Sequence, residues 1–512
     1  MELQNKPVYL RGKALDLLLI LLISLVSVTC FLGSNPQQLL VFDDSYITLR
    51  FAENFFTYSG ITYDGSTFFS GATSPLHIIC IALLGLFMKM EQASLAIGVI
   101  FFVLSSFLVY LWTLALYGSR RTALLAGLLT ATCGWLVFDA LNGLETTAFI
   151  FFSLLTFYLY YRYQPRALYA VPLALSVLTR PDGWFIAGAL WMWQIIRYFG
   201  ERDKQRVKHL VISIEIFLIL ILPYLLLSLY QTGSLLSNTA YAKAAFFGEG
   251  TLPFINKAGC FMNGLLFFYR TPYYPAILLL VPLLLCARKI ISLSYLWLYI
   301  GFFYLSYFLF FPCSIRHYWC RYQHIFIPLI ILAMSGGAFE VLKRSKKPVF
   351  KGLLAALAGL VILYNQAASF TSAAEIYSIQ LNSMRNPQID LARWLNSNTP
   401  DNSLIALHDI GTVGYFSERK MLDLVGLVNP EVTGYYLDQQ SKRVIPLSQR
   451  NIIGFLKEKR PDYLVMFYEW DRFFNLLHSG NSKYFQLLHT TLPLYPTAMR
   501  YRVFKCSWED ND

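Results

Sequence analysis

The chain has 512 residues, of which 56% are hydrophobic and only 14% are charged. Soluble domains are nearer a quarter charged, so this composition excludes an ordinary soluble globular protein. A net charge of +12 would suggest nucleic-acid binding in a soluble protein. Here the basic residues lie between apolar runs, where Lys and Arg set membrane topology and contact anionic lipids. We therefore expect a membrane protein with no nucleic-acid partner.

Apolar runs of about 20 residues recur, the length at which a helix crosses about 30 Å of hydrocarbon. The first, from Ala14 to Gly33, has no small-residue cleavage site, so it is predicted to remain as an anchor. With basic clusters assigned to the cytoplasm, we predict eleven crossings, the N-terminus inside and the C-terminus outside. The predicted spans are 14–33, 94–117, 122–140, 147–163, 167–180, 183–199, 209–230, 273–287, 293–312, 323–342 and 352–369.

The basic clusters that set this topology are Lys6/Arg11/Lys13, Arg120/Arg121, Arg162/Arg166, Arg197 through Lys208, Arg288/Lys289 and Lys343 through Lys351. The stretch 76–90 is apolar but too short to cross the membrane. Counting it as a crossing would place every later basic cluster on the outer side. We predict that it forms a half-inserted helix on the outer side, within an outer loop that runs from residue 34 to residue 93.

Two adjacent acidic residues, Asp43 and Asp44, begin the polar part of this loop. Carboxylates this close to a bilayer are costly unless they face water, a cation or a reaction. Asp43, Tyr46, Arg50 and Asn54 share one face of a predicted interfacial helix, and we expect that face to line an aqueous cleft. Arg50 would orient a carboxylate or hold a phosphate. The structural alternative is an ordinary interfacial helix whose N-cap is provided at Asp44-Ser45.

Further polar residues fall in the other predicted outer loops. They are Glu145, Arg180, Asp182, Lys243, Arg316, His317 and Arg321. Guanidinium groups bind phosphate with a fork geometry, so several cations facing one carboxylate pair on a membrane surface suit a phosphorylated lipid. The alternative for Arg180 and Asp182 is a simple ion pair across a tight turn. For residues 71–76 the alternative is a plain helix start with Pro at its first position.

The eight cysteines are scattered singly, and most lie in apolar stretches, where we expect small core residues and no metal site. A bridge between Cys313 and Cys320, which lie outside a span, is the one disulfide that the spacing leaves open.

After about residue 370 the composition becomes mixed. Helix is expected at 391–395 and 451–459, strand at 403–407, 463–467 and 501–505, and a turn around Gly411 and Gly414. This alternation predicts an α/β domain over 371–512, on the outer side, in addition to a transmembrane module over 1–370.

Six motifs occur in a characteristic order: Asp43 to Asn54, Gly71 to Leu76, Gly143 to Thr146, Thr179 to Gly183, Asn238 to Lys243 and Arg321-Tyr322. In this order the chain resembles the GT-C superfamily of polytopic glycosyltransferases. Within it, the sequence is most similar to the mycobacterial terminal arabinofuranosyltransferase (AftB-like) enzymes and the related LphB-like proteins. The tail resembles their outer domain in His408-Asp409-Ile410-Gly411 and in Leu422 to Leu427.

This resemblance implies a polytopic α-helical fold and the transfer of a sugar from a polyprenyl-phosphate donor to a glycan or glycolipid acceptor. By the resemblance, Asp43 or Asp44 is the general base, and Asp43 is preferred with Asp44 orienting. Cations would offset charge on the leaving lipid phosphate, and Arg180, Lys243, Arg316 and Arg321 are the candidates. Tyr46, Arg50, Asn54, Glu145, Asp182, His317, His408 and Asp409 are expected to bind or orient substrate.

Direct displacement would invert the anomeric centre, since no two-carboxylate arrangement for a double displacement is visible. The aspartate pair permits a divalent cation such as Mg²⁺ or Mn²⁺ but does not require one. The implied location is the bacterial inner membrane. Two alternatives remain at this point: a flippase or transporter of a lipid-linked sugar, and a non-enzymatic scaffold for envelope assembly.

Overall fold

The computed structural model describes residues 6–164, 166–235, 237–270, 293–344, 347–438, 440–441, 443–477, 480–492 and 500–508. The predicted span 273–287 and the basic pair Arg288/Lys289 lie outside these residues. The chain divides into two compact units. The first comprises Met1–Gln38, Ser94–Pro223 and Phe254–Tyr377, and the second comprises Leu39–Ala93, Tyr224–Pro253 and Ser378–Asp512.

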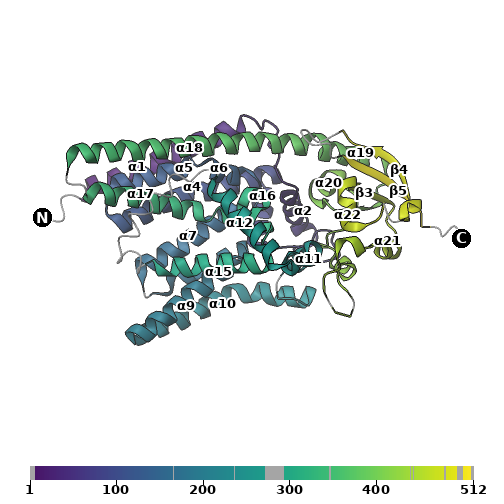
Figure 1. Ribbon diagram of the computed structural model, residues 1–512, viewed down its shortest axis with the longest axis horizontal. Helices are drawn as coiled ribbons and strands as arrows, with labels where there is room; N and C mark the ends of the chain where they lie inside the picture. The colour runs from purple at the N-terminus through teal and green to yellow at the C-terminus, as the bar shows by residue number, and fades with distance from the viewer. Residues whose placement is uncertain are drawn as a thin grey trace. The chain divides into compact units, whose positions relative to one another are not determined.

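The first unit consists of helices (Figure 1). Their bounds are α1 Lys6–Leu32, α4 Met90–Tyr117, α5 Arg120–Ala131, α6 Gly134–Leu141, α7 Thr146–Tyr163, α8 Ala170–Thr179, α9 Gly183–Glu201, α10 Lys204–Thr232, α12 Phe254–Arg270, α15 Ser294–Phe310, α16 His317–Cys320, α17 Phe326–Arg344 and α18 Pro348–Ser383. The unit boundaries fall inside α4, α10 and α18. Every predicted span that lies in the described residues coincides with one of these helices or with a pair of them.

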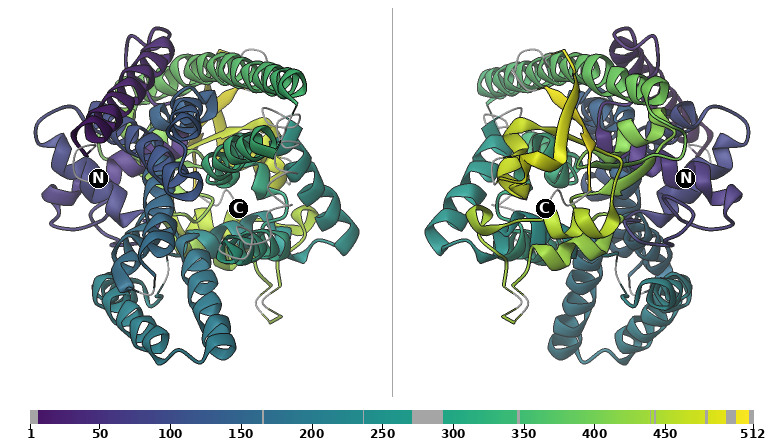
Figure 2. Two further views of the ribbon diagram at one scale, coloured as in Figure 1. Left: turned by 90° about the vertical axis from the view of Figure 1, so that its left-hand side faces the viewer. Right: turned by 90° about the vertical axis from the view of Figure 1, so that its right-hand side faces the viewer.

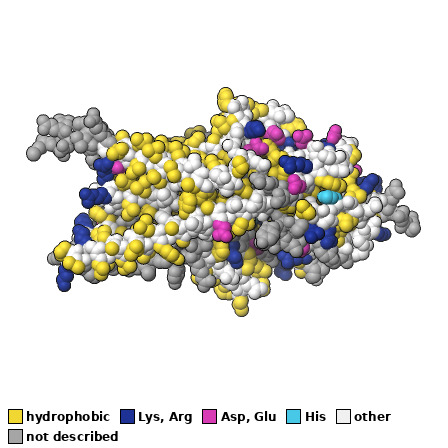
Figure 3. Space-filling view, turned by 90° about the horizontal axis from the view of Figure 1, so that it is seen from above, with side chains coloured by type: hydrophobic (Ala, Val, Ile, Leu, Met, Phe, Trp, Pro, Cys, Tyr) yellow, Lys and Arg dark blue, Asp and Glu magenta, His cyan; other side chains and the backbone are white. Residues whose placement is uncertain are grey.

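Length and composition qualify four helices of the described part as membrane spans: the apolar stretches that begin at Gly12, Met90, Lys204 and Lys351. Two pairs of shorter helices are each bent by 50°: α5 with α6, and Ser314–Gln323 with Phe326–Glu340. If each bent pair crosses as one span, there are two further spans. The predicted number of crossings and their direction stay predictions. Figure 3 shows apolar side chains over most of the visible helical surface, with Lys and Arg gathered at the end where α1 begins.

Packing in the first unit includes an ion pair near that end whose acidic partner is buried and whose arginine is half-exposed. Arg120 Nε donates to Asp16 Oδ2 at 2.7 Å, and Tyr110 Oη donates to the same oxygen at 2.9 Å. The Asp16 side chain is almost fully buried. A carboxylate buried at a helix contact is tolerated because cation and phenol together replace its hydration. This contact fixes α1 against α5.

The second unit combines two outer segments with the tail of the chain. Its helices are α2 Asp43–Thr57, α3 Pro75–Gly85, α11 Thr239–Phe247, α19 Asp390–Asn398, α20 Ile410–Ser417, α21 Ile453–Lys459 and α22 Asp471–Phe474. The helix predicted after Asp43 is present as α2, and α3 begins at Pro75 as expected, while the interfacial position of α2 stays a prediction. The expected turn around Gly411 and Gly414 is wrong, because both residues lie inside α20.

The tail contains a five-stranded sheet with the order β2-β1-β3-β5-β4. The strands are β1 Leu404–Leu407, β2 Lys420–Asp423, β3 Tyr463–Phe467, β4 Phe485–Thr490 and β5 Tyr501–Cys506. β2, β1 and β3 are parallel, and β5 and β4 continue the sheet antiparallel. β4 and β5 are the neighbouring yellow strands in Figure 2. The predicted α/β domain is confirmed, while β2 and β4 were not predicted.

The apolar core beside this sheet includes a residue from an outer loop. Phe246 of α11 is fully buried and packs against Tyr436, Phe473 and Phe474. Burying an aromatic ring of this size contributes on the order of 2–3 kcal/mol. The loop that carries α11 is therefore part of the folded tail domain. The last unit boundary falls after Tyr377, and the predicted division at residue 370 stays a prediction.

Candidate active site

The acidic pair opens helix α2, and its first carboxylate caps another helix. The N-cap of α2 is Phe42, with no side-chain cap, so the expected cap at Asp44-Ser45 is not what starts this helix. Asp43 Oδ2 instead accepts the N–H of Gly411 at 2.9 Å, and Oδ1 accepts the N–H of Thr412 at 2.7 Å. Both donors are free amides of the first turn of α20, where the helix dipole favours a negative group.

Glycine is required at position 411 by the close approach of α2. A Cβ built there would stand 1.9 Å from the backbone oxygen of Asp43 and 2.8 Å from its Oδ2. Any side chain would push the two segments apart and break the cap. Gly411 of the tail motif therefore contacts Asp43 of the outer-loop motif directly.

The environment of Asp43 favours its protonated form. Burial and the nearby charge of Asp409 raise the pKa of Asp43 to about 8, against the two backbone N–H bonds, which lower it. Asp44 adds a smaller contribution in the raising direction. A general base is most effective when its pKa lies near the working pH, so Asp43 has the basicity that proton removal from a hydroxyl requires. The side chain of Asp44 is half-buried and has no hydrogen bond or ion pair among the described residues.

Asp409 is held from the opposite side by the sheet. Tyr501 Oη, at the start of β5, donates to Asp409 Oδ2 at 2.6 Å, and Gln388 Nε2 donates to Tyr501 Oη at 2.8 Å. His408 Nε2 lies 3.4 Å from the same carboxylate oxygen. The imidazole is buried and stacked on Trp470, and burial lowers the pKa of His408. The tail motif therefore places a second carboxylate next to the acidic pair.

Two of the four residues on the predicted polar face of α2 are buried, and the other two, Asp43 and Arg50, are partly exposed. Tyr46 is fully buried against Tyr415 and Phe416 of α20. Asn54 is also buried, and its Nδ2 donates to two backbone carbonyls of the loop that follows. Arg50 forms an ion pair with Glu53 at 2.9 Å. Tyr46 is therefore covered by α20, which the sequence did not reveal, and Asn54 is held by the loop after α2.

The second outer-loop motif is bound to the loop that carries Lys243. The N–H of Gly71, a residue with a φ of +82°, donates to Asn238 Oδ1 at 3.0 Å, and Thr239 Oγ1 donates to the carbonyl of Gly71 at 3.3 Å. Asn238 Nδ2 in turn donates to the carbonyl of Gly426 at 3.4 Å. Two motifs of the predicted order and the tail motif Leu422 to Leu427 therefore meet at the start of α11. Lys243 follows one turn later on this helix and is half-buried.

The other end of α11 is held by a buried arginine that the sequence did not single out. Arg450 Nη1 donates to the carbonyl of Phe246 at 2.6 Å, and Nη2 donates to that of Ala245 at 3.1 Å. The guanidinium also lies over the ring of Tyr436, 5.0 Å from its centroid. A cation at a helix C-terminus interacts favourably with the dipole, so Arg450 fixes the helix that presents Lys243.

In the first unit, Arg180 is surrounded by acidic and aromatic groups. Its Nη1 donates to Glu145 Oε1 at 2.9 Å, and its Nε donates to Asp182 Oδ2 at 3.1 Å. The guanidinium lies over the ring of Tyr322, 4.8 Å from its centroid. The ion pair between Arg180 and Asp182 that the sequence left open is present, and Glu145 completes it. The carboxylates of Glu145 and Asp182 thus balance the positive charge of Arg180.

The remaining predicted cations lie in the segment that follows α15. Arg321 is buried, with its Nη1 3.8 Å from Glu145 Oε1, so it shares that carboxylate with Arg180. Arg316 is exposed and lies over the ring of Phe267, 5.0 Å from its centroid. The described residues give Arg316 no carboxylate partner. His317 is half-buried among neighbouring tyrosine rings.

This arginine-bearing segment has an unusual backbone. Tyr318, Trp319 and Cys320 are consecutive left-handed residues, with φ values of 46°, 57° and 65°. Each such residue costs about 1–2 kcal/mol relative to ordinary backbone, so the surrounding structure must hold the turn in place. Gln323 Nε2 provides one restraint, donating to the carbonyl of Gly264 in α12 at 3.4 Å.

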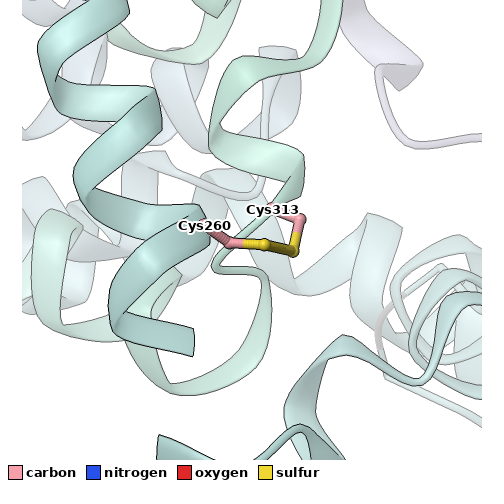
Figure 4. Close-up of a disulfide and its surroundings, with 2 residues drawn as sticks. All are labelled: Cys260 and Cys313. Atoms are coloured by element: carbon pink, nitrogen blue, oxygen red, sulfur yellow. A yellow bond between two sulfur atoms is a disulfide. The ribbon is translucent and has the colours of Figure 1, made fainter. Parts of the chain in front are cut away.

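A disulfide fixes the start of the same segment (Figure 4). Cys260 of α12 is bonded to Cys313, which follows α15. The bridge that the spacing left open, between Cys313 and Cys320, is therefore wrong, and Cys320 is a free, buried thiol. Fifty-three residues separate the bonded cysteines, and only the packing of α12 brings them together. Disulfides persist in oxidising compartments, which agrees with the predicted outer location of this loop.

A buried pair of titratable residues was missed. His324 Nδ1 lies 2.7 Å from Asp139 Oδ2, and Asn142 Nδ2 donates to Asp139 Oδ1 at 3.2 Å. The sequence carried a signal, since an ionisable residue inside an apolar span requires a partner. The pair joins the end of α6 to the segment after the left-handed turn, in the same unit as Arg180.

The acidic groups do not form a ready metal site. Among the described residues there is no group of three or more His, Cys, Asp or Glu side chains placed to hold a metal ion. Each carboxylate oxygen of Asp43 accepts one backbone N–H group. The divalent cation that the sequence permits stays a prediction, and no chemical step is derived through one.

Comparison with solved structures identifies the fold. Crystal structures of ArnT from Cupriavidus metallidurans match over 95% of this chain and 97% of theirs. The apo form gives a TM-score of 0.59 at 13% identity, and the form bound to undecaprenyl phosphate gives 0.57 at 12%. The chain has the ArnT fold, which is the GT-C fold. A family model described as a domain of unknown function (DUF8728) matches residues 374–504. No curated protein matches the sequence.

Proposed function

We propose that this protein is a GT-C glycosyltransferase that moves a sugar from a polyprenyl-phosphate donor to a hydroxyl group of an envelope glycan or lipid. The observation that carries this proposal is the fold match with ArnT over almost the whole of both chains, including a form bound to undecaprenyl phosphate. The order of the sequence motifs favours acceptor chemistry of the AftB-like and LphB-like kind within this fold.

In the proposed reaction, Asp43 is the general base and Asp44 orients the acceptor. Asp43 takes the proton of the acceptor hydroxyl as its oxygen bonds to the anomeric carbon from the face opposite the lipid phosphate. The bond between that carbon and the phosphate oxygen breaks, the polyprenyl phosphate leaves, and the configuration inverts. The raised pKa of Asp43 supports this assignment, because a more basic carboxylate accepts the proton more readily.

Leaving-group charge requires cations that are not already neutralised. Arg180 and Arg321 share Glu145 and Asp182, so a phosphate would have to compete with these carboxylates for them. Arg316 is exposed without a carboxylate partner, which makes it the first choice for a lipid-phosphate contact. Lys243 is proposed as a second phosphate contact because it belongs to the motif from Asn238 to Lys243, and not because it lacks a partner.

The proposed setting is the bacterial inner membrane, with the N-terminus in the cytoplasm and the tail domain outside. A cysteine placed at Gly434, where the surroundings are open, tests the orientation. It should react with a membrane-impermeant maleimide added to intact spheroplasts. Labelling only after membrane disruption would contradict the orientation.

To test the activity, each variant is expressed in cells that lack the native protein. Membranes from these cells are offered a panel of undecaprenyl-phosphate donors, each carrying a different radiolabelled sugar. Asp43→Asn should reduce transfer by about 10²–10⁴-fold, the usual contribution of a general base. Asp44→Asn should reduce it less. Asp390→Asn is the control, because Asp390 is an exposed residue of α19 whose ion-pair partner among the described residues is Arg393. Undiminished transfer by the Asp43/Asp44 double variant would refute the general-base assignment.

A further inference from the structure

The acidic pair of the outer loop has a third carboxylate beside it, delivered by the tail domain. Asp409 stands two residues before Gly411, whose N–H is bonded to Asp43. Its own carboxylate is bonded to the phenol of Tyr501, which Gln388 fixes from the other side. Because Tyr501 is fully buried in β5, Asp409 cannot move away from Asp43 without breaking this contact.

The charges around this cluster are predominantly negative. Asp43 and Asp44 come from α2, and Asp409 comes from the turn before α20. The neutral groups packed against them are the phenols of Tyr63 and Tyr501 and the buried imidazole of His408. Tyr63 Oη donates to the backbone carbonyl of Ile410 at 2.7 Å.

The nearest arginine on α2, Arg50, is paired with Glu53. Within the described part of the chain, no Lys or Arg forms an ion pair with any of the three carboxylates. Three acidic groups without a cation favour retention of a proton, because each negative charge makes the ionisation of the next more costly. The turn before α20 thus supplies an electrostatic influence that helix α2 alone would lack.

We propose that Asp409 is a positioning residue of the transfer reaction, which, held by Tyr501, makes Asp43 a stronger base. This inference rests on the proposed function for its role in catalysis. It assigns the tail domain a part in the chemistry, since the tail supplies both the amides that hold Asp43 and a charge that adds to the effect of burial on its basicity. Asp409 does not contact the acceptor in this account and acts only through Asp43.

Infrared titration of the full-length protein in lipid nanodiscs tests the electrostatic part without any substrate. Protonated carboxyl groups absorb apart from carboxylates, and the Asp43 band is identified by its loss in Asp43→Asn. In the wild type this band should titrate near pH 8, in accord with the raised pKa of Asp43. In Asp409→Asn the midpoint should fall by about one pH unit or more, the effect of removing a close like charge. Asp409→Glu and Asp390→Asn should leave it near the wild-type value.

The same variants are then compared by the pH profile of sugar transfer. Asp409→Asn should lower kcat on the high-pH plateau and move the rising limb to lower pH, whereas KM for the donor should change little. A purely structural role would reduce activity at every pH without moving the limb. If Asp409→Asn does not fold, Tyr501→Phe should shift the titration midpoint in the same direction by a smaller amount.

An unchanged midpoint in a folded Asp409→Asn protein overturns the inference. So does a wild type with no carboxyl group titrating between pH 6 and 9. These outcomes are separable from failure of the proposed function. If Asp43→Asn abolishes transfer but Asp409→Asn keeps the wild-type midpoint, the general base stands and only the role of Asp409 is lost. If the midpoint shifts but the double Asp43/Asp44 variant transfers sugar normally, the electrostatic coupling stands and the catalytic role fails.

Discussion

The contact between Gly411 and Asp43 offers a sharp test of how the tail domain supports the acidic pair. In Gly411→Ala the new methyl group would stand 1.9 Å from the backbone oxygen of Asp43, far inside van der Waals contact. The first turn of α20 must therefore withdraw, and both N–H bonds to the Asp43 carboxylate are lost. Hydrogen bonds to a charged group contribute about 1.5 kcal/mol or more each, so the pair represents about 3 kcal/mol.

Because the two N–H bonds from α20 lower the pKa of Asp43, their loss does not weaken the base. The expected effect on transfer comes from displacement of the carboxylate, since a shift of about 1 Å reduces a rate by about 100-fold. The assay is transfer from labelled undecaprenyl-phosphate sugar by purified protein, with thermal unfolding of the same samples. Gly434→Ala is the matched control, because nothing lies within 4 Å of a Cβ at that position of the same domain. A Gly411→Ala protein with wild-type transfer and stability would refute the claim that the contact holds Asp43 in place.

Three further predictions follow from other contacts. The disulfide between Cys260 and Cys313 should protect both thiols from alkylation unless a reductant is present, and Cys260→Ser should destabilise the protein by about 2–4 kcal/mol, as measured by thermal unfolding. Arg450→Lys should destabilise the tail domain by about 2 kcal/mol, since an ammonium cannot reach both carbonyls at the end of α11. Limited proteolysis of the loop that carries α11 measures this loss of stability, and an unchanged cleavage rate would contradict the prediction. Transfer should rise with pH through about 8, because only ionised Asp43 accepts a proton and burial and Asp409 raise its pKa; a rate that is flat between pH 6 and 9 would exclude Asp43 as the base.

Those parts of the protein that depend on local pattern could be predicted from the amino-acid sequence. Long apolar runs predicted the helices of the first unit, because a chain in hydrocarbon must satisfy its own backbone hydrogen bonds. The amphipathic spacing after Asp43 predicted α2, and Pro75 marked the start of α3. Alternating short elements predicted the α/β tail, and Tyr463–Phe467 was located with its observed bounds because it is a continuous apolar run.

The tertiary structure alone decided which of these parts meet. Nothing near Asp43 in the sequence shows that its partners are the amides of Gly411 and Thr412, 368 and 369 residues away. Cys260 and Cys313 are likewise joined only by helix packing, whereas sequence proximity favoured Cys320. Periodicity reports which face of an element is apolar, but it carries no information about which element covers that face. The pairing of carboxylates, amides and arginines at this candidate site is therefore a property of the folded chain.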